Sequence, residues 1–507
     1  MTLPQGLTPL RRPALLWGIL AACIVRLWLM PLTSSFWVDE MVTVFVVRHP
    51  ADPSLAPVPQ VPASIYYWLP RLTQHFTQHL FGESEVSWRI PSVLAMAFAL
   101  FLIGRIAARL IHPRANWFAM FAGLGLHGIN YCAADARPYA LGICVASLSV
   151  WFLIRWLDAS RWIDGLAFVV AASLLWRVQL IYWPFYLVFL IYAALRLARK
   201  ETKAGFWQTA GLFGILAISL IPVALNALLV LHQASAHVIS ELPGFREFEH
   251  ATRWSLVVIC TAGTWLVARL LKWPIPRASL LGGSSIVLIA AWWLVQPLAL
   301  YVFSRVTGDS VFISRYVSLA LPGTALMATA AAAMFIPPDR WASVSLALGA
   351  GVLLVMGQWG TAELRHDNSD WRSAARAETR LATTSDMPVI CLSPFVEARP
   401  PIWTPDYPLP GFLYSHLSFY PLKGRFYLFP FGAAARDGEA YALRLTADTL
   451  SKSPRFVVYG ANNFWRSWFA DNPELKGWRN RLEMFGDVQL AVFDAPETAA
   501  DTAHGVR

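Results

Sequence analysis

The segment Ser35-Phe36-Trp37-Val38-Asp39-Glu40-Met41 places two adjacent carboxylates a few residues beyond the first apolar stretch of the chain. Acidic residues beside Trp and Phe at a membrane surface are costly to desolvate, so acidic residues in such a position usually serve a function. A solvated loop start with an interfacial aromatic residue is the alternative interpretation. The residues around this segment decide between the two.

The composition is that of a membrane protein. Of the 507 residues, 56% are hydrophobic and only 14% are charged, and the mean hydropathy is +0.47. Soluble chains carry about 25% charged residues, so a polytopic membrane protein is predicted. The net charge of +10 does not indicate nucleic-acid binding, because Lys and Arg fall mostly between apolar spans. The five cysteines show neither CxxC nor Cys/His spacing, which indicates neither a disulfide framework nor a zinc site.

About eleven stretches are long and apolar enough to cross a bilayer. They cover residues 15–31, 91–111, 117–134, 139–156, 162–180, 181–197, 206–231, 254–271, 279–303, 316–336 and 341–359. The fifth and sixth stretches nearly touch around Arg177, so the boundary between them stays open.

The loop charges predict the orientation in the membrane. Arg11, Arg12 and the basic run from Arg196 to Lys203 lie on the same predicted face as most other loop cations. By the positive-inside rule this face, with the N-terminus, is cytoplasmic. An odd number of spans then places residues 361–507 outside. We therefore expect a multi-pass protein of a bacterial inner (plasma) membrane with a periplasmic C-terminal domain.

Two domains are expected, a transmembrane module at 1–360 and an extracytoplasmic domain at 361–507. The module has a long first outer loop, 32–90, in which an aromatic amphipathic helix from Arg71 to Phe81 should lie in the membrane interface. The tail contains short β-type runs at 389–392, 426–429, 456–459 and 488–493. The expected fold class is a mainly α, polytopic membrane protein with a small C-terminal α/β domain.

Three groups of polar residues are predicted to lie on the outer face. They are Asp39-Glu40, Asp135-Ala136-Arg137-Pro138-Tyr139-Ala140 between the third and fourth spans, and Ser314-Arg315-Tyr316 at the start of the tenth. Carboxylates and arginines at one membrane face form a site for a charged headgroup whose tail stays in lipid. Arg suits this task, because its planar fork binds phosphate in a bidentate manner.

These motifs resemble a known family. Phe36-Trp37-Val38-Asp39-Glu40 is similar to the acidic loop motif of GT-C class membrane glycosyltransferases. The most similar are family 39-like enzymes, which include bacterial protein O-mannosyltransferases and lipid A aminoarabinose transferases. Tyr66-Tyr67-Trp68-Leu69, Arg315-Tyr316 and Asp370-Trp371-Arg372 also resemble recurrent patterns of bacterial members. The chain departs from the pattern at Ala63-Ser64, where relatives often have two prolines, and at Arg177-Val178-Gln179, where they often have His.

The resemblance implies an inverting hexosyl- or pentosyltransferase with a GT-C-like catalytic module at 1–360. The donor would be a polyprenyl-phosphate sugar, and Asp39 would be the general base. Further roles would fall to residues that orient Asp39 or meet the acceptor (Glu40, Asp135), bind the donor phosphate (Arg137, Arg315) or contact the donor or its sugar (Tyr66, Tyr67, Tyr139, Tyr316). No cofactor is required and no metal is indicated, although a divalent metal stays open. The acceptor is a protein, lipid A or a polysaccharide.

Other interpretations remain open at this point. The chain could be a transporter or lipid flippase without transferase activity, although transporters place charges near the midplane of repeated halves. An enzyme that uses a diphosphate donor, like an O-antigen ligase, is a third class. Asp135 could instead form a structural ion pair with Arg137, Arg315 could anchor a helix at lipid headgroups, and the tyrosines could be interfacial belt residues. The sequence indicates neither the sugar nor an oligomeric state.

Overall fold

The computed structural model describes residues 11–56, 58, 61–231, 241–274, 282–360, 364–382, 385–399, 403–406, 411–432 and 436–496. The chain divides into two compact units. The first comprises Met1–Thr33 and Ala63–His366, and the second comprises Ser34–Pro62 and Asp367–Arg507. The domain boundary expected at residue 360 stays a prediction, and in the structure Ser34–Pro62 groups with the C-terminal residues.

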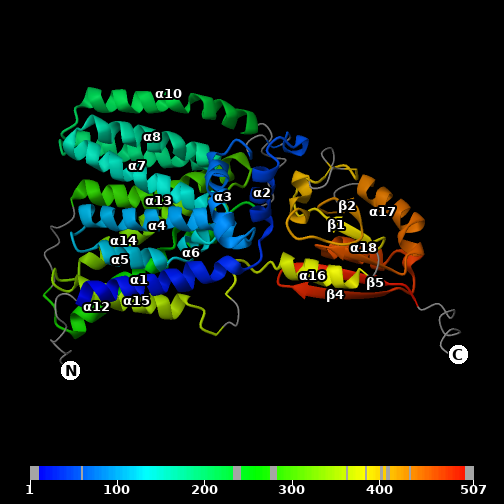
Figure 1. The fold of residues 1–507 in the computed structure, drawn as a ribbon. Coiled ribbons are helices and arrows are strands. Elements are labelled where there is room, and N and C mark those ends of the chain that lie inside the picture. The colour runs from blue at the N-terminus through cyan, green and yellow to red at the C-terminus, as the bar shows by residue number, and fades with distance from the viewer. Residues whose placement is uncertain are drawn as a thin grey trace. The chain divides into compact units, whose positions relative to one another are not determined.

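The first unit is built from helices. In chain order they are α1 (Arg11–Ile24), η1 (Val25–Leu29), η2 (Met30–Thr33), η4 (Ile65–Tyr67), α3 (Trp68–Phe81), α4 (Glu85–Leu110), α5 (Asn116–Leu124), α6 (His127–Ala133), α7 (Tyr139–Ala159), α8 (Trp162–Val178), η5 (Leu180–Phe185), α9 (Tyr186–Ala198), α10 (Phe206–Leu231), α11 (Phe245–Thr252), α12 (Trp254–Leu270), α13 (Gly283–Thr307), η8 (Ser318–Ala320), α14 (Leu321–Ala333) and α15 (Trp341–Met356). Within this unit α8 packs between α7 and α10 (Figure 1).

Several helices are long and apolar enough to span a membrane. Within the described residues six qualify: Pro13–Thr33, Glu85–Leu110, Tyr139–Ala159, Leu180–Ala198, Phe206–Leu228 and Gly283–Thr307. A seventh is added if Phe245–Thr252 and Trp254–Leu270, bent by 50°, form one span. The chain is thus a multi-pass membrane protein, while the expected number of about eleven spans stays a prediction. The sequence left the boundary between the fifth and sixth apolar stretches open near Arg177. In the structure this boundary falls at Gln179, whose extended backbone (φ −158°, ψ 133°) separates α8 from η5.

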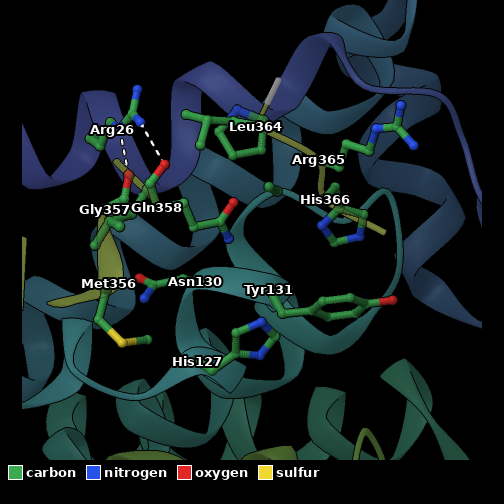
Figure 2. Close-up of a pocket in the computed structure, with 13 residues that line it drawn as sticks. Arg26, His127, Asn130, Tyr131, Met356, Gly357, Gln358, Leu364, Arg365 and His366 are labelled. Carbon is green, nitrogen blue, oxygen red and sulfur yellow. Dashed lines mark hydrogen bonds between the residues drawn. The ribbon is translucent and has the colours of Figure 1, made fainter. Parts of the chain in front are cut away.

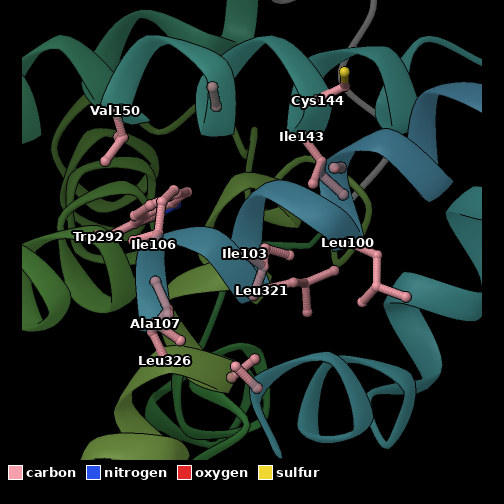
Figure 3. Close-up of a cluster of buried hydrophobic side chains, with 14 of the residues drawn as sticks. Leu100, Ile103, Ile106, Ala107, Ile143, Cys144, Val150, Trp292, Leu321 and Leu326 are labelled. Atoms are coloured by element: carbon pink, nitrogen blue, oxygen red, sulfur yellow. The ribbon is translucent and has the colours of Figure 1, made fainter. Parts of the chain in front are cut away.

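Buried aliphatic side chains hold the first unit together. Figure 3 shows Leu100, Ile103 and Ile106 of α4 in one cluster with Ile143 of α7 and Leu321 of α14. Many other apolar side chains remain exposed on the outer helices, as in Ile218 and Leu225 of α10. A helix that is apolar all round must bury one side in protein and the other in lipid, so this distribution fits a membrane environment.

Helix α3 is amphipathic, as the sequence predicts. Trp68, Leu72, Phe76 and Leu80 follow one another at intervals of four residues and are all exposed, by 60–76%. Residues four apart share one face of a helix. This aromatic and aliphatic stripe is the kind of surface that lies in a membrane interface.

The second unit is an α/β domain. Its strands are β1 (Pro388–Leu392), β2 (Arg425–Phe429), β3 (Arg455–Tyr459), β4 (Arg479–Phe485) and β5 (Val488–Asp494), and its helical segments are α2 (Val38–Arg48), η3 (Pro53–Leu55), α16 (Trp371–Leu381), η9 (Phe412–Leu417), α17 (Arg436–Asp448), η10 (Leu450–Lys452), α18 (Asn463–Ala470) and η11 (Pro473–Leu475). The strand order is β2-β1-β3-β5-β4. Strand β1 is parallel to β2 and β3, whereas β5 is antiparallel to β3 and β4.

Helices cover both faces of this sheet. Ile390, Val458 and Phe493 point towards α17 and α18 in one apolar cluster. On the opposite face, Tyr459 donates a hydrogen bond from its hydroxyl to the carbonyl of Trp371 in α16 (3.3 Å). The four strands expected from the sequence are all present. The strand that was not expected is β4, which is a charged edge strand without apolar alternation.

Candidate active site

Asp135, Arg137 and Tyr139 lie at the turn between α6 and α7 in the first unit. Pro138 immediately precedes α7, and its fixed φ and missing N–H suit a helix start. Asp135 and Tyr139 are fully buried, whereas Arg137 is half-buried. The turn therefore places one carboxylate and one guanidinium two residues apart in the chain, between two apolar helices.

The structure pairs Asp135 with a residue that the sequence did not suggest. The Nε2 atom of His366 lies 3.6 Å from Oδ1 of Asp135, and both side chains are buried. The His366 ring also packs against the ring of Tyr131 in a tilted arrangement, with ring centroids 4.2 Å apart (Figure 2). Since 231 residues separate the pair in the chain, no local spacing could have predicted it.

The two tyrosines of the first outer loop, Tyr66 and Tyr67, lie in the same region, where Tyr66 is near Asp135 and Arg137. Tyr66 and Tyr67 are 0% and 4% exposed, so they are buried within the protein and do not form an interfacial belt. Ser64 caps their turn through its Oγ, which accepts from the N–H of Tyr66 (3.2 Å) and donates to the carbonyl of Val178 (2.6 Å). Burial raises the pKa of Tyr66, and the charge of nearby Asp135 raises it further.

Tyr182 joins the Arg137 region to the start of α14. Its hydroxyl lies 3.4 Å from Oγ of Ser318, and Arg137 and Tyr316 lie near enough to interact with it electrostatically. A side chain at Gly142 would collide with the Tyr182 ring, so the glycine makes room for it. The sequence did not single out Tyr182, because it lies inside an apolar run that reads as part of a span.

Arg315 and Tyr316 are held next to this group. The Arg315 guanidinium lies over the Tyr316 ring, 5.7 Å from its centroid. The side chain of Gln296 donates a hydrogen bond to the carbonyl of Tyr316 (2.8 Å), which ties the segment to α13. Within the first unit, the structure thus groups Tyr316 with Arg137 around Tyr182 and places Arg315 beside it.

Asp39 and Glu40 belong to the second unit, in the first turn of α2. The Oε2 atom of Glu40 accepts a hydrogen bond from the N–H of Trp37 (3.3 Å), so Glu40 caps its own helix. Asp39 is half-buried, and Glu40 is fully buried. The two adjacent acids therefore have different surroundings.

Residues of the C-terminal part of the second unit fix the start of α2. The N–H of Phe36 donates to the hydroxyl of Tyr420 (2.8 Å). The Oγ of Ser35 accepts from the N–H of Arg372 (3.1 Å) and donates to the Tyr420 hydroxyl (3.3 Å). Asp370 caps α16 by accepting from the N–H of Ser373 (3.0 Å). The acidic-loop motif and the Asp370-Trp371-Arg372 motif thus meet inside one unit.

The comparisons with known proteins agree with this architecture. Residues 66–224 match the family model of dolichyl-phosphate-mannose-protein mannosyltransferase. Two crystal structures of ArnT from Cupriavidus metallidurans align over 96% of this chain, at 12% identity. The structure bound to undecaprenyl phosphate has a TM-score of 0.52 with 98% of its chain covered, and the apo structure has 0.54 with 100% covered. The chain has the fold of the GT-C class membrane glycosyltransferases.

The GT-C fold confirms the family resemblance and the expected fold class. A search of curated proteins finds no match. The family match covers Tyr66, Asp135, Arg137 and Tyr182, and it ends before Arg315. Most of the polar residues grouped in the first unit therefore lie within the residues that match the family model.

Among the described residues of this unit, Asp135 and His366 carry groups that could contribute ligands to a metal site. A carboxylate oxygen and an imidazole nitrogen both bind divalent metals. A protein site usually supplies at least three such ligands, so this pair alone does not define one.

Proposed function

We propose that this chain is an inverting glycosyltransferase that moves a sugar from a polyprenyl-phosphate donor to an acceptor at the outer face of a bacterial inner membrane. The observation that carries the proposal is the grouping of Arg137 with Tyr66, Tyr182 and Tyr316 in a GT-C fold. ArnT, which shares the fold, has been crystallised with undecaprenyl phosphate. A lipid-linked donor suits a site at the ends of apolar helices, because its tail stays in the bilayer.

In this proposal Arg137 and Arg315 bind the donor phosphate. Guanidinium groups bind phosphate oxygens through two parallel hydrogen bonds, and such bonds strengthen where water is scarce. Tyr66, Tyr67, Tyr139 and Tyr316 would contact the donor or its sugar. Tyr182 joins them as a further candidate, since its hydroxyl lies among the same groups.

Asp39 is proposed as the general base. It removes the proton of the acceptor hydroxyl or amine while that atom attacks the anomeric carbon. The bond between this carbon and the phosphate oxygen breaks, and the polyprenyl phosphate leaves with the electron pair. One displacement inverts the configuration at the anomeric carbon. Because phosphate is a good leaving group, a second carboxylic acid is less necessary here than in a glycosidase.

Glu40 and Asp135 are assigned supporting roles. Glu40 caps the helix that carries Asp39, so it orients its neighbour rather than acting as a second base. Asp135 lies beside His366 and next to Tyr66, which favours a contact with the acceptor or with the residues that hold it. Neither role requires a cofactor.

The experiment that tests the proposal is transfer by the purified full-length protein in lipid nanodiscs. Polyprenyl-phosphate hexoses and pentoses are offered as donors, and cell-envelope material from a strain without the gene is offered as acceptor. Mass spectrometry should find one sugar added to an acceptor, and NMR of the product should show an anomeric configuration inverted relative to the donor. Movement of the donor across the bilayer without any transferred sugar would instead support the transporter alternative.

The proposed orientation has its own test. We propose a cytoplasmic N-terminus and a periplasmic C-terminal domain, since loop cations gather on the face that carries Arg11 and Arg12. A reporter that is active only in the periplasm, fused after Arg507, should then be active. An active cytoplasmic reporter at the same position would contradict the assignment.

A further inference from the structure

Helices α9 and α10 are consecutive in the chain, yet each packs mainly on a different helix of the first unit. Residues 199–205 join them, and two helices with so short a link usually pack side by side. Here α9 packs on α13, whereas α10 packs on α8. An open groove of about 680 Å³ remains between α9 and α10. This volume lies within the range of about 300–1,000 Å³ that is typical of ligand sites.

The walls of the groove are small and apolar. Ala194 of α9 and Ala210 of α10 line it and are exposed, and Leu190 and Phe213 continue the apolar surface. Both helices belong to segments that are long and apolar enough to span a membrane, and most of α10 is not buried in protein. Such a helix presents its outer side to lipid. The groove is therefore accessible to the hydrocarbon of the bilayer.

One end of the groove carries a positive charge. Among the described lining residues, Lys200 is the only one with a charged side chain, and it is exposed. Lys200 has a left-handed backbone (φ 55°) just beyond the end of α9. Its N–H donates to the carbonyl of Leu197 (3.1 Å), and the N–H of Glu201 donates to that of Arg196 (2.9 Å). These two bonds form a Schellman motif, which fixes the backbone of Lys200 at this end of the groove.

Two acids near the end of α9 bind other groups. The carboxylate of Glu201 accepts a hydrogen bond from the hydroxyl of Ser284 at the start of α13. The carboxylate of Asp158 forms an ion pair with the guanidinium of Arg196 (2.9 Å). Neither acid lines the groove, so the charge of its lining is that of Lys200.

Aromatic residues indicate the depth of this end in the membrane. Phe206, which also lines the groove, and Trp207 lie at the start of α10 and are exposed by 61% and 83%. Exposed aromatic side chains at the end of a spanning helix are typical of the membrane–water interface. Lys200 therefore lies at the level of lipid headgroups, and the apolar walls extend from it along the acyl chains.

The groove is distant from the proposed donor-phosphate site. The N–H of Lys203 donates to the carbonyl of Leu157 (2.9 Å), which ties the link between α9 and α10 to the C-terminal end of α7. Arg137 lies just before the other end of α7, which begins at Tyr139. The 21 residues of α7 cover about 30 Å at 1.5 Å per residue, about the thickness of the hydrocarbon core.

We propose that this groove binds an anionic phospholipid, with one acyl chain between α9 and α10 and the phosphate at Lys200. The chain fills a space that the described side chains leave open, and it gains dispersion contacts with both helices. The ammonium group attracts the negative headgroup, whereas the choline of a zwitterionic lipid cancels that attraction. Because the site lies at the other end of α7 from Arg137, the inference does not rest on the proposed transfer reaction.

Native mass spectrometry of the full chain in detergent micelles tests the headgroup contact, because it counts the lipids that stay bound. Phosphatidylglycerol and phosphatidylcholine with identical oleoyl chains are titrated separately, and the Kd of the first bound lipid is measured. Lys200→Gln removes the charge. The matched control is Lys272→Gln, because Lys272 is also exposed, also has a left-handed backbone (φ 52°) just beyond a helix, α12, and does not line the groove.

A second pair of variants tests the acyl-chain contact. Ala210→Trp places an indole in the groove, and the matched control Ala217→Trp changes an exposed alanine of α10 that does not line it. If Ala210→Trp fails to fold, Ala194→Phe fills the groove from α9 instead.

The wild type should bind phosphatidylglycerol more tightly than phosphatidylcholine. Lys200→Gln should raise the Kd for phosphatidylglycerol about fivefold and leave that for phosphatidylcholine nearly unchanged. Ala210→Trp should raise the Kd for phosphatidylglycerol at least about tenfold, and both controls should behave as the wild type. Equal affinity of the wild type for the two lipids would overturn the proposal. So would an equal loss in Lys200→Gln and Lys272→Gln, or wild-type binding of phosphatidylglycerol by the variant with the filled groove.

Discussion

The N–H of Phe36 donates a hydrogen bond of 2.8 Å to the hydroxyl of Tyr420, 384 residues further along the chain. The bond fixes the peptide two residues before α2, in whose first turn Asp39 lies. Ring contact between Phe36 and Phe419, with centroids 4.8 Å apart, reinforces it. The C-terminal part of the second unit therefore sets the position of the acidic motif.

Removing this hydroxyl should impair turnover more than donor binding. We expect Tyr420→Phe to lower kcat and to leave the KM for the donor nearly unchanged, because the ring stays and only the hydrogen bonds from the N–H of Phe36 and the Oγ of Ser35 are lost. The cost in unfolding free energy should be about 1–3 kcal/mol, as for two hydrogen bonds. Tyr427→Phe, a change on β2, serves as the control. Equal kcat values in Tyr420→Phe and the wild type would show that Tyr420 does not position the motif.

Asp39→Asn should remove transfer without unfolding the protein. The amide keeps the shape of the side chain but cannot take the acceptor proton, and general-base catalysis contributes about 10²–10⁴-fold. The rate should thus fall at least about a hundredfold, while donor binding persists. Glu40→Gln should lose less, because an amide oxygen can still accept from the N–H of Trp37. Transfer by Asp39→Asn at nearly the wild-type rate would make Asp135 the next candidate for the base.

Arg137→Ala and Arg315→Ala should weaken donor binding as well as turnover. A charged hydrogen bond to phosphate contributes about 1.5–3 kcal/mol, which is about ten- to a hundredfold in affinity. Titration with a polyprenyl phosphate that lacks the sugar measures this directly. Arg305→Gln, at an exposed position on α13, is the control. If both Ala variants bind the lipid as the wild type does, these arginines anchor their helices at lipid headgroups instead.

The sequence predicts those features that depend on local pattern. Each expected apolar stretch contains a helix, and β1 to β3 and β5 follow their β-branched and aromatic runs. The sequence does not predict contacts between residues that are far apart in the chain. Three contacts join segments that are more than a hundred residues apart in the chain: His366 with Asp135, Tyr182 with Ser318, and Tyr420 with Phe36. Such contacts follow from packing, and no spacing in the chain encodes them.

The sequence also did not predict that Ser34–Pro62 groups with the C-terminal residues in one unit. Helix α2 is apolar except at its ends, and it lies in the stretch that the sequence assigns to the first outer loop, 32–90. The segment that follows α2 contacts the C-terminal residues through backbone and hydroxyl groups, as in the hydrogen bond from the N–H of Phe412 to the Oγ of Ser54 in η3 (2.7 Å). Residue types alone do not reveal such bonds, because every residue except proline carries a backbone N–H.

The last prediction concerns the pH dependence of stability in the second unit. Glu378 of α16 is fully buried against the sheet, and its burial raises its pKa to about 7. Its Oε2 accepts from the N–H of Lys423 (3.1 Å) and from the hydroxyl of Thr379 (3.4 Å). In the unfolded chain the pKa returns to about 4.3. Between these two values the folded state holds a proton that the unfolded state has released, so stability falls as the pH rises.

Glu378→Gln should abolish this loss, because the amide is neutral at every pH and its oxygen can still accept the hydrogen bonds. At pH 8 we expect the variant to have a higher unfolding temperature than the wild type and a free energy of unfolding that is larger by at most about 4 kcal/mol. Near pH 4 the two proteins should match. His416, whose pKa burial lowers to about 3, destabilises both proteins equally at low pH and so cancels from the comparison. Thermal unfolding followed at both pH values in the two proteins measures the difference. A gap between them that is the same at pH 4 and pH 8 would mean that the carboxyl of Glu378 keeps an ordinary pKa.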